Sequence, residues 1–337
     1  MTSFKQMDLD AYAAAHREEW DRLAQLGRKG RMTGAEADEL IDRYQSGASQ
    51  LSAIKTTAGQ SLQGDRLSLY LSRARLRFTG TSSNVLLQLT RFFALQLPAA
   101  LYRIRWLSLV VTVASFAVGA LYAVWAASNP QVLATMGDAS ALESYAKEDF
   151  VDYYSNQSGE AFTGFVWTNN AWLATQCVAF GIVGVYAPYL LFTNAQQLGL
   201  TAAIMAEYDR LDVFFLYIAP HGQLELYSIF VAGAAGMRIF WSWVAPGART
   251  RGQALAEDGR ALFTVAVGLI LALLVSGLIE GWITRQEWPW AIKIGIGTVA
   301  LAAFLFYQWR VGRWAARGGE TGDLDEFEAG AKRLIAG

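Results

Sequence analysis

Long apolar runs alternate with short polar segments through the last two thirds of the chain. The first run, "LSLVVTVASFAVGALYAVWAA" at 107–127, holds no charged residue over about twenty positions, enough for a helix to cross a hydrocarbon core of about 30 Å. This pattern predicts membrane spans at 106–127, 171–193, 197–219, 223–244, 261–283 and 290–309. The third span is the most polar, and we expect it to be a polar, broken or tilted crossing. Its charged residues are Glu207, Asp209, Arg210 and Asp212.

The first hundred residues follow an amphipathic pattern instead. Apolar residues recur at three- and four-residue spacing over 8–28 and 35–57, which predicts two helices that each bury one face. The positions expected to be buried are Leu9, Tyr12, Trp20, Leu23, Leu40, Ile41, Tyr44, Leu51 and Ile54. Thr33 followed by Glu36 fits a capping box at the start of the second helix.

The segment "VLLQLTRFFALQLPAALYRIRW" at 85–106 predicts an amphipathic helix leading into the first span, with a kink at Pro98. Two interpretations stay open. The helix packs against its own domain, or it lies on the membrane surface, which the arginines of this segment favour.

Charge is distributed unevenly, and the asymmetry predicts the topology. From Arg66 to Arg105 there are seven arginines and no acidic residue, whereas 128–170 holds six acidic residues and one lysine. Arginines also follow the fourth and the last predicted spans. The positive-inside rule therefore places both termini in the cytoplasm. Six crossings satisfy this arrangement, and the alternative is five, with 197–219 re-entrant or lying along the membrane.

The same argument divides the chain into domains. We expect a cytoplasmic helical domain at 1–104 that ends in the amphipathic helix, a transmembrane domain at 105–312, and a cytoplasmic tail at 313–337. Within the transmembrane domain, 128–170 is expected to lie outside, where it alternates acidic and aromatic residues. It is either an ordered cover over the helix ends or a binding surface for an extracytoplasmic partner.

The composition agrees with a membrane protein. Hydrophobic residues make up 53% of the chain and charged residues 17%, whereas a soluble domain carries about 25% charged residues. A net charge of −1 offers no general basic surface, so we expect no nucleic-acid partner. The single cysteine, Cys177, lies in an apolar run and cannot form an internal disulfide. The predicted fold class is all-α, a polytopic helical membrane bundle.

Ionisable residues within the apolar spans are the candidate chemistry. His221 and Glu225 are four residues apart, so they share one face of a helix, and Ser228 extends this polar stripe. Glu280 near the end of the fifth span falls at the same predicted membrane depth, on the outer side. Because a lone carboxylate in lipid costs several kcal/mol or becomes protonated, we expect these groups to meet in one polar cluster. Its predicted members are His221, Glu225, Glu280, Asn169, Asn170 and Ser228.

Enzymatic and metal sites find little support in the sequence. A metal site needs three or more ligands, and the chain has only two histidines, of which His16 lies in the N-terminal domain. A zinc site would need Glu225, Glu280 or Asp212 as additional ligands. No GxSxG or HExxH motif occurs. We therefore expect no catalytic residue, no metal and no cofactor.

Small residues at four-residue spacing predict close helix contacts in the membrane. They occur in "VAGAAG" (231–236) and in "FGIVG" (180–184). Packing within the chain is favoured over a subunit interface, although a homo-oligomer would use the same residues. The predicted packing positions are Gly181, Gly184, Ala232, Gly233 and Gly236.

Three motifs in order resemble one known family. They are "TNNAWLATQCVAFGIVGVYAPYLLFTNAQQLG" (168–199), "PHGQLELYSIFVAGAAGMRI" (220–239) and "SGLIEGWIT" (276–284). Together they resemble the stage II sporulation protein M family, with a resemblance that covers about residues 85–285. The family has no established catalytic residues, so the polar positions carry over only as signature positions.

The resemblance implies a non-enzymatic scaffold or assembly subunit of a cell-envelope complex in a bacterial cytoplasmic membrane. Sporulation members of the family are similar to scaffolds that recruit peptidoglycan-remodelling enzymes. Other members are similar to partners of an RDD-type membrane protein and a MoxR-type ATPase system. These classes and the lipid bilayer are the partners we expect. A transporter or permease-like subunit with a polar intramembrane site is the alternative, and an intramembrane enzyme is the third hypothesis.

Overall fold

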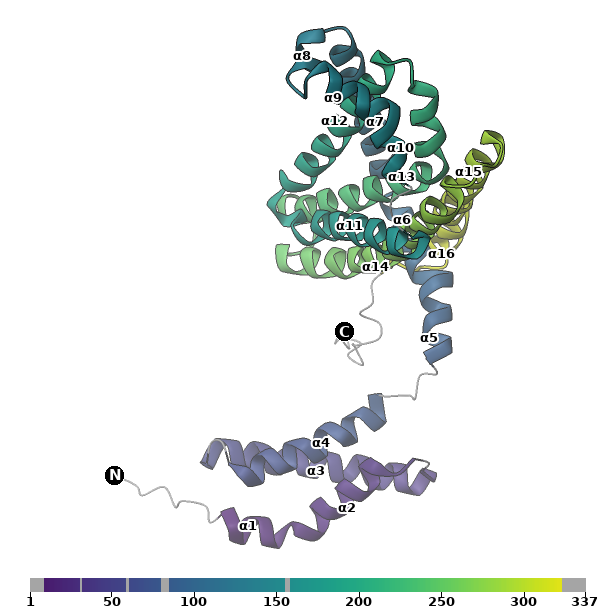
Figure 1. Cartoon of the computed structure of the whole chain (residues 1–337). Helices are drawn as coiled ribbons and strands as arrows, with labels where there is room; N and C mark the ends of the chain where they lie inside the picture. The colour runs from purple at the N-terminus through teal and green to yellow at the C-terminus, as the bar shows by residue number, and fades with distance from the viewer. Residues whose placement is uncertain (1–8, 31, 59–60, 80–84, 155–157, 323–337) are drawn as a thin grey trace. The chain divides into compact units, whose positions relative to one another are not determined.

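The computed structural model describes residues 9–30, 32–58, 61–79, 85–154 and 158–322. These residues contain helices and no β-strand, which confirms the all-α fold class. They form two compact units that divide between Gln88 and Leu89, hereafter the N-terminal unit and the membrane unit (Figure 1). The sequence predicted a domain boundary between residues 104 and 105, where the chain would enter the membrane. The division into compact units does not test that boundary, which stays a prediction.

The described residues of the N-terminal unit form four helices around a small apolar core. They are α1 (Leu9–Ala15), α2 (Arg17–Arg28), α3 (Gly34–Ala58) and α4 (Leu62–Thr79). Leu23, Leu40 and Ile54 are fully buried, as the spacing predicts. The expectation for Ile41 is wrong, because this side chain is 42% exposed. Leu40 faces the core, and Ile41 is rotated about 100° from it around the helix.

Local polar contacts fix the ends and the interior of this unit. The capping box is confirmed, since Thr33 N–H donates to Glu36 and Glu36 N–H donates to the Thr33 hydroxyl. The buried indole N–H of Trp20 donates to the Gln50 side chain at 2.7 Å. This bond satisfies a polar group that would otherwise be costly to bury.

The segment before the first span packs into the membrane unit. It consists of α5 (Val85–Arg91), a π-helical segment Phe92–Gln96 and α6 (Leu97–Arg103). Residues Leu97 to Leu101 are buried, and Pro98 stands in the first turn of α6, where it interrupts no helical hydrogen bond. Gln308 donates to the Leu101 carbonyl and ties α6 to the last part of the chain. Helix α6 therefore packs within the membrane unit.

The main helices of the membrane unit follow in chain order. They are α7 (Arg105–Ala127), α11 (Gly159–Ala179), α12 (Tyr186–Glu207), α13 (Leu211–Val244), α14 (Arg251–Leu278) with its π-helical extension Ile279–Thr284, and α15 (Trp290–Phe306). A second π-helical segment, Tyr307–Val311, leads from α15 into α16 (Gly312–Arg317). Four helical stretches are long and apolar enough to cross a membrane: Arg105–Ala127, Leu211–Val244, Arg251–Thr284 and Trp290–Arg317.

The predicted second and third spans are wrong in their bounds. The helix is interrupted inside both ranges. Helix α11 ends and α12 begins within 171–193, and α12 ends and α13 begins within 197–219. The first break follows a short 3₁₀ turn, Gly181–Val183, and is made by Gly184 at φ 73°. Glycine is strongly favoured in this left-handed region. Gly184 is therefore a turn position, and it is also a packing position, because an added methyl group would lie 2.6 Å from the Phe240 ring of α13.

The second break is a helix C-cap built on an aspartate. Asp209 adopts φ 55°, and Arg210 N–H donates to the Met205 carbonyl while Asp209 N–H donates to the Ala206 carbonyl. This pair of bonds is the Schellman arrangement, in which aspartate takes the place usually held by glycine. The charged residues that suggested a polar span thus belong to a helix terminus and the start of the next helix.

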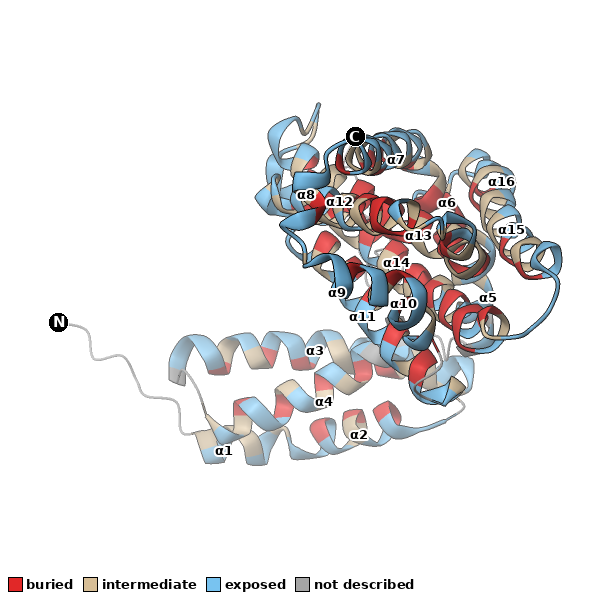
Figure 2. Cartoon of the chain, turned by 45° about the horizontal axis from the view of Figure 1, so that its top comes forward, coloured by how far each residue is buried: buried red, intermediate tan, exposed pale blue. Residues whose placement is uncertain are grey.

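Helix α13 occupies the centre of the membrane unit. It packs against α7, α11, α12, α14 and α15, and every residue from Tyr227 to Gly236 is buried (Figure 2). By contrast, α7 and α15 present long apolar side chains outward, among them Val113 at 62% exposed and Val299 at 70%. Such an exposed apolar belt is suited to lipid rather than water.

Between α7 and α11, short helices form a compact cover. They are α8 (Pro130–Ala134), α9 (Ala139–Ser144), a π-helical segment Tyr145–Asp149 and α10 (Phe150–Asp152). Phe150 and Tyr154 are buried and contact the aromatic side chains of Phe214 and Tyr217 on α13. This packing supports the interpretation of the segment as an ordered cover.

Candidate functional site

Two ionisable residues of the site come from the middle of α13. The sequence suggested that a span begins just after Pro220, but α13 runs through this proline, and His221 lies about three turns beyond the helix start. An internal proline is tolerated in a membrane helix where neighbouring groups satisfy the freed backbone atoms. His221 is 3% exposed and Glu225, one turn later, is partly buried.

The third ionisable residue, Glu280, lies in the π-helical extension of α14 and is 4% exposed. Ligand-type atoms of His221, Glu225 and Glu280 all lie within 4.8 Å of one another. The closest measured approach joins His221 Nε2 and Glu280 Oε1 at 3.6 Å. A π-helical turn at this position is notable because such turns often mark functional sites.

Neutral polar side chains hold these groups in place. The Ser276 hydroxyl lies 3.0 Å from the His221 carbonyl oxygen and 3.4 Å from Glu225 Oε2. The Asn170 side chain of α11 also forms a hydrogen bond to Glu225. His221 Nδ1 lies 3.3 Å from the Thr284 hydroxyl. Three helices, α11, α13 and α14, therefore converge on one polar group, which we name the His221 group: His221, Glu225, Glu280, Asn170, Ser276 and Thr284.

Two predicted members do not belong to it. Asn169 is exposed and lies outside the group. Ser228 is fully buried, but its hydroxyl donates at 2.7 Å to the Leu224 carbonyl of its own helix. Helix geometry explains both cases, because Asn169 is rotated by about 100° from Asn170 and a buried serine can bond its own preceding turn.

The sequence prediction missed Ser276 and Thr284, although a signal for them exists. They stand four residues before and four residues after Glu280, so they flank a buried carboxylate along one helix. Lys293 of α15 was also missed. It is 4% exposed, and its ammonium donates to the Thr284 carbonyl at 2.9 Å while facing the Tyr217 ring at 5.3 Å.

An aromatic residue that follows the short helices of the cover lies beside the group. Tyr154 is 3% exposed, and its ring centre lies 6.2 Å from that of His221. Burial, and then the charges of Glu280 and Glu225, raise the pKa of the Tyr154 phenol far above its ordinary value. The phenol therefore stays protonated at physiological pH.

A second buried polar network lies toward the other end of α13. Asp258 of α14 has a fully buried carboxylate that pairs with Arg103 at 2.8 Å, Arg249 at 3.2 Å and Arg238 at 3.4 Å. Ser242 donates to the same carboxylate at 2.5 Å. Arg238, whose side chain is 39% exposed, thus pairs with a buried acid on the next helix.

Gly181 and Gly236 lie where two backbones nearly touch, Gly233 lies against the Leu191 side chain of α12, and Ala232 is fully buried. A methyl group added at Gly236 would overlap the Cys177 carbonyl of α11, and one added at Gly181 would lie 2.6 Å from Gly236 Cα. These contacts position α11 against α13 and thereby bring Asn170 to Glu225.

Comparison with known proteins yields two family matches. A family model described as Stage II sporulation protein M matches residues 109–285, and one described as a domain of unknown function, DUF8413, matches residues 10–80. No curated protein and no solved structure matches the chain. The first match includes every member of the His221 group, and the second covers most of the N-terminal unit.

Proposed function

The chain belongs to the stage II sporulation protein M family, whose model matches more than half of its 337 residues, and from this premise we propose a non-enzymatic membrane scaffold. It would serve as an assembly subunit of a bacterial cell-envelope complex. One observation carries this proposal: a helical unit with its own core is joined to a second compact unit that holds the apolar helices. A chain with this organisation can hold a partner with one unit while the other stays in the bilayer.

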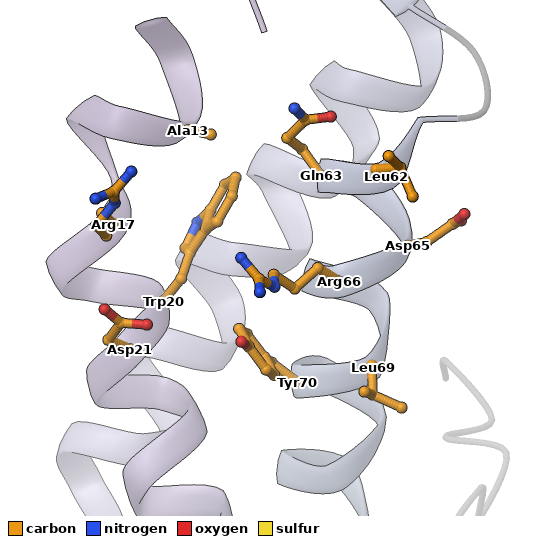
Figure 3. Close-up of a pocket in the computed structure, with 10 residues that line it drawn as sticks. All are labelled: Ala13, Arg17, Trp20, Asp21, Leu62, Gln63, Asp65, Arg66, Leu69 and Tyr70. Atoms are coloured by element: carbon orange, nitrogen blue, oxygen red, sulfur yellow. The ribbon is translucent and has the colours of Figure 1, made fainter. Parts of the chain in front are cut away.

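The N-terminal unit offers a surface for such a partner. A groove of about 680 Å³ runs between the helices that carry Trp20 and Arg66, whose side chains point toward each other across it (Figure 3). Its rim combines exposed leucines, Leu62 at 85% and Leu69 at 50%, with charged side chains of both signs. Exposed apolar residues surrounded by charges are typical of protein interaction sites.

We infer six crossings, with both termini in the cytoplasm. Besides the four helical stretches of sufficient length and apolarity, α11 and α12 have 21 and 22 residues, which span about 30 Å. The Tyr208 hydroxyl at the end of α12 donates to the Ala139 carbonyl, shortly after α7. This bond supports a model in which α7 and α12 end on the same, outer side.

The partner classes that we propose are an RDD-type membrane protein, a MoxR-type ATPase system and peptidoglycan-remodelling enzymes. Residues 128–158 are acidic and would face the enzymes outside, whereas the N-terminal unit would meet a cytoplasmic component. The complex would be located in the cytoplasmic membrane.

Photo-crosslinking in native membranes, followed by affinity purification and mass spectrometry, tests the scaffold. We expect the wild-type chain to capture a defined envelope protein and Leu69→Glu to capture much less of it, because a charge then occupies the groove. Ile41→Glu is the matched control, since Ile41 is a similarly exposed apolar residue of the same unit outside the groove. Equal capture by all three chains would refute the assignment of the groove, and no specific capture at all would refute the scaffold.

A transporter or permease-like subunit is the second candidate, and the buried carboxylates of the His221 group favour it. It predicts a solute flux into proteoliposomes that Glu225→Gln abolishes without loss of partner capture. The scaffold predicts no such flux.

A further inference from the structure

The hydrogen-bond network around Thr284 fixes the orientation of the His221 imidazole. Thr284 has one hydroxyl proton, and that hydroxyl lies 3.4 Å from the Ile279 carbonyl, to which it can only donate. With that proton donated to Ile279, its oxygen is free to accept from the Nδ1–H of His221 at 3.3 Å. We assign the neutral tautomer with hydrogen on Nδ1, which leaves a lone pair on Nε2.

This lone pair faces the Glu280 carboxylate, at a distance too long for a direct hydrogen bond. Nε2 lies 3.6 Å from Glu280 Oε1, which is longer than a hydrogen bond. The other oxygen, Oε2, is buried and has no hydrogen-bond partner among the described residues. A carboxylate that is 96% buried and partly unpaired next to a nitrogen lone pair is stabilised by a proton or a cation between them.

A buried lysine near the group does not supply a positive charge to these carboxylates. Its ammonium, that of Lys293, donates to the Thr284 carbonyl and forms no ion pair with Glu225 or Glu280 in the described part of the chain. When both carboxylates are ionised and the imidazole is neutral, the group carries two negative charges, which a divalent cation balances.

We propose that His221 Nε2, Glu225 and Glu280 bind one divalent transition-metal ion. Two ligands of a tetrahedral ion, each about 2.1 Å from it, lie about 3.4 Å apart, close to the observed separation of the histidine and Glu280 atoms. All three ligand atoms lie within 4.8 Å of one another, so side-chain shifts of about 1.4 Å or less bring each pair to this spacing. One nitrogen and two carboxylate oxygens suit Zn²⁺, which is the first ion to test.

The surroundings match those of known metal sites. A metal-bound histidine usually donates its other ring N–H to a fixed acceptor, which is the role of Thr284. Ser276 and Asn170 contact Glu225 in the same supporting way. Glu225 is the least buried of the three ligands, and it therefore marks the side from which an ion enters. The small number of histidines made a metal site unexpected from the sequence. In the folded chain, two carboxylates lie next to the one histidine of the membrane unit.

Metal analysis of the full-length chain, purified without a polyhistidine tag, tests the proposal. After incubation with Zn²⁺ and removal of excess ion, we expect one zinc per chain in the wild type. Glu280→Gln and His221→Asn should lose it. Asp212→Asn is the matched control, because Asp212 is an exposed carboxylate on the same helix outside the group, and it should keep the metal.

A variant that keeps all three ligands distinguishes a specific loss of metal binding from a loss caused by misfolding. Thr284→Val removes only the partner of the imidazole and should weaken zinc affinity by about 10- to 100-fold. Zinc should also raise the melting temperature of the wild type and of Asp212→Asn, and not that of Glu280→Gln. Zinc, Co²⁺ and Mn²⁺ contents well below one ion per wild-type chain, or equal contents in Glu280→Gln, would overturn the proposal. This inference is independent of the scaffold, since either can fail while the other holds.

Discussion

Glycine residues set the distance between the central helices. In lipid, association gains little from the hydrophobic effect, so close packing and hydrogen bonds between helices carry most of it. Gly236 of α13 and Gly181 after α11 bring two backbones together at the level of Cys177. The absence of a side chain at these two glycines therefore allows the close approach of the backbones.

We expect Gly236→Ala to lower the stability of the purified protein by about 1–3 kcal/mol, because the new methyl group overlaps the Cys177 carbonyl. Gly295→Ala on α15 is the control, since nothing lies within 4 Å of the added group there. That substitution should leave stability unchanged or raise it by up to about 1 kcal/mol. Thermal unfolding in the same detergent measures both. Equal melting temperatures for the two variants would contradict the packing argument.

At the scale of elements, helices α2 and α3 are joined by an ionic arrangement centred on Glu39. Arg22 of α2 donates to both carboxylate oxygens, at 3.1 and 2.8 Å, and Arg43 donates to one of them from the next turn of α3 at 2.8 Å. These bonds lower the pKa of Glu39 from 4.5 to about 2. The carboxylate is solvent-accessible, so its effect is screened by salt.

The sign of this shift predicts a pH dependence for the N-terminal unit. Because the folded-state pKa is depressed, the contribution of Glu39 is present above 4.5 and is lost as the pH falls toward about 2. Hydrogen exchange of α2 and α3, corrected for intrinsic rates, should show protection that decreases between neutral pH and about pH 3. Glu39→Gln should show a smaller decrease, whereas Glu18→Gln, at an exposed position of α2, should behave like the wild type. The same decrease in all three chains would rule out Glu39 as its source.

At the scale of the whole membrane unit, two buried polar networks lie along α13. The His221 group includes Glu225, and the Asp258 network includes Arg238, which is about 20 Å further along the helix. This separation is a large part of a hydrocarbon thickness of about 30 Å. We therefore expect the arginine-rich network near the inner surface and the His221 group in the outer half.

Cysteine labelling checks this orientation. Cys177 is fully buried, so it contributes little background reaction with a maleimide. Ser140→Cys in α9 should react with a membrane-impermeant maleimide added to intact cells, because we infer that α9 lies outside. Gly252→Cys at the start of α14 should react only after the membrane is opened. Labelling of Ser140→Cys solely from the cytoplasmic side would reverse the topology.

The sequence by itself determined the class of the protein and the identity of its family. Apolar runs of about twenty residues can only be satisfied in a bilayer as helices, and three-to-four-residue spacing gives the amphipathic helices of the N-terminal unit. Ordered motifs around Asn170, His221 and Glu280 pointed to the family that the comparison then identified. The capping box at Thr33 was equally readable, because its two hydrogen bonds join residues three positions apart.

Only the tertiary structure decided where helices α11 and α12 end. Their breaks depend on Gly184 and Asp209 adopting left-handed conformations, and neither apolar periodicity nor charge reports a backbone angle. The partners of Asp258 and Glu280 come from helices distant in the chain, so no local spacing reveals them. The orientation of His221 toward Glu280 depends in turn on one hydroxyl, at Thr284. Contacts of this kind follow from packing in three dimensions, because a linear pattern records which face of a helix is polar and does not record what that face meets.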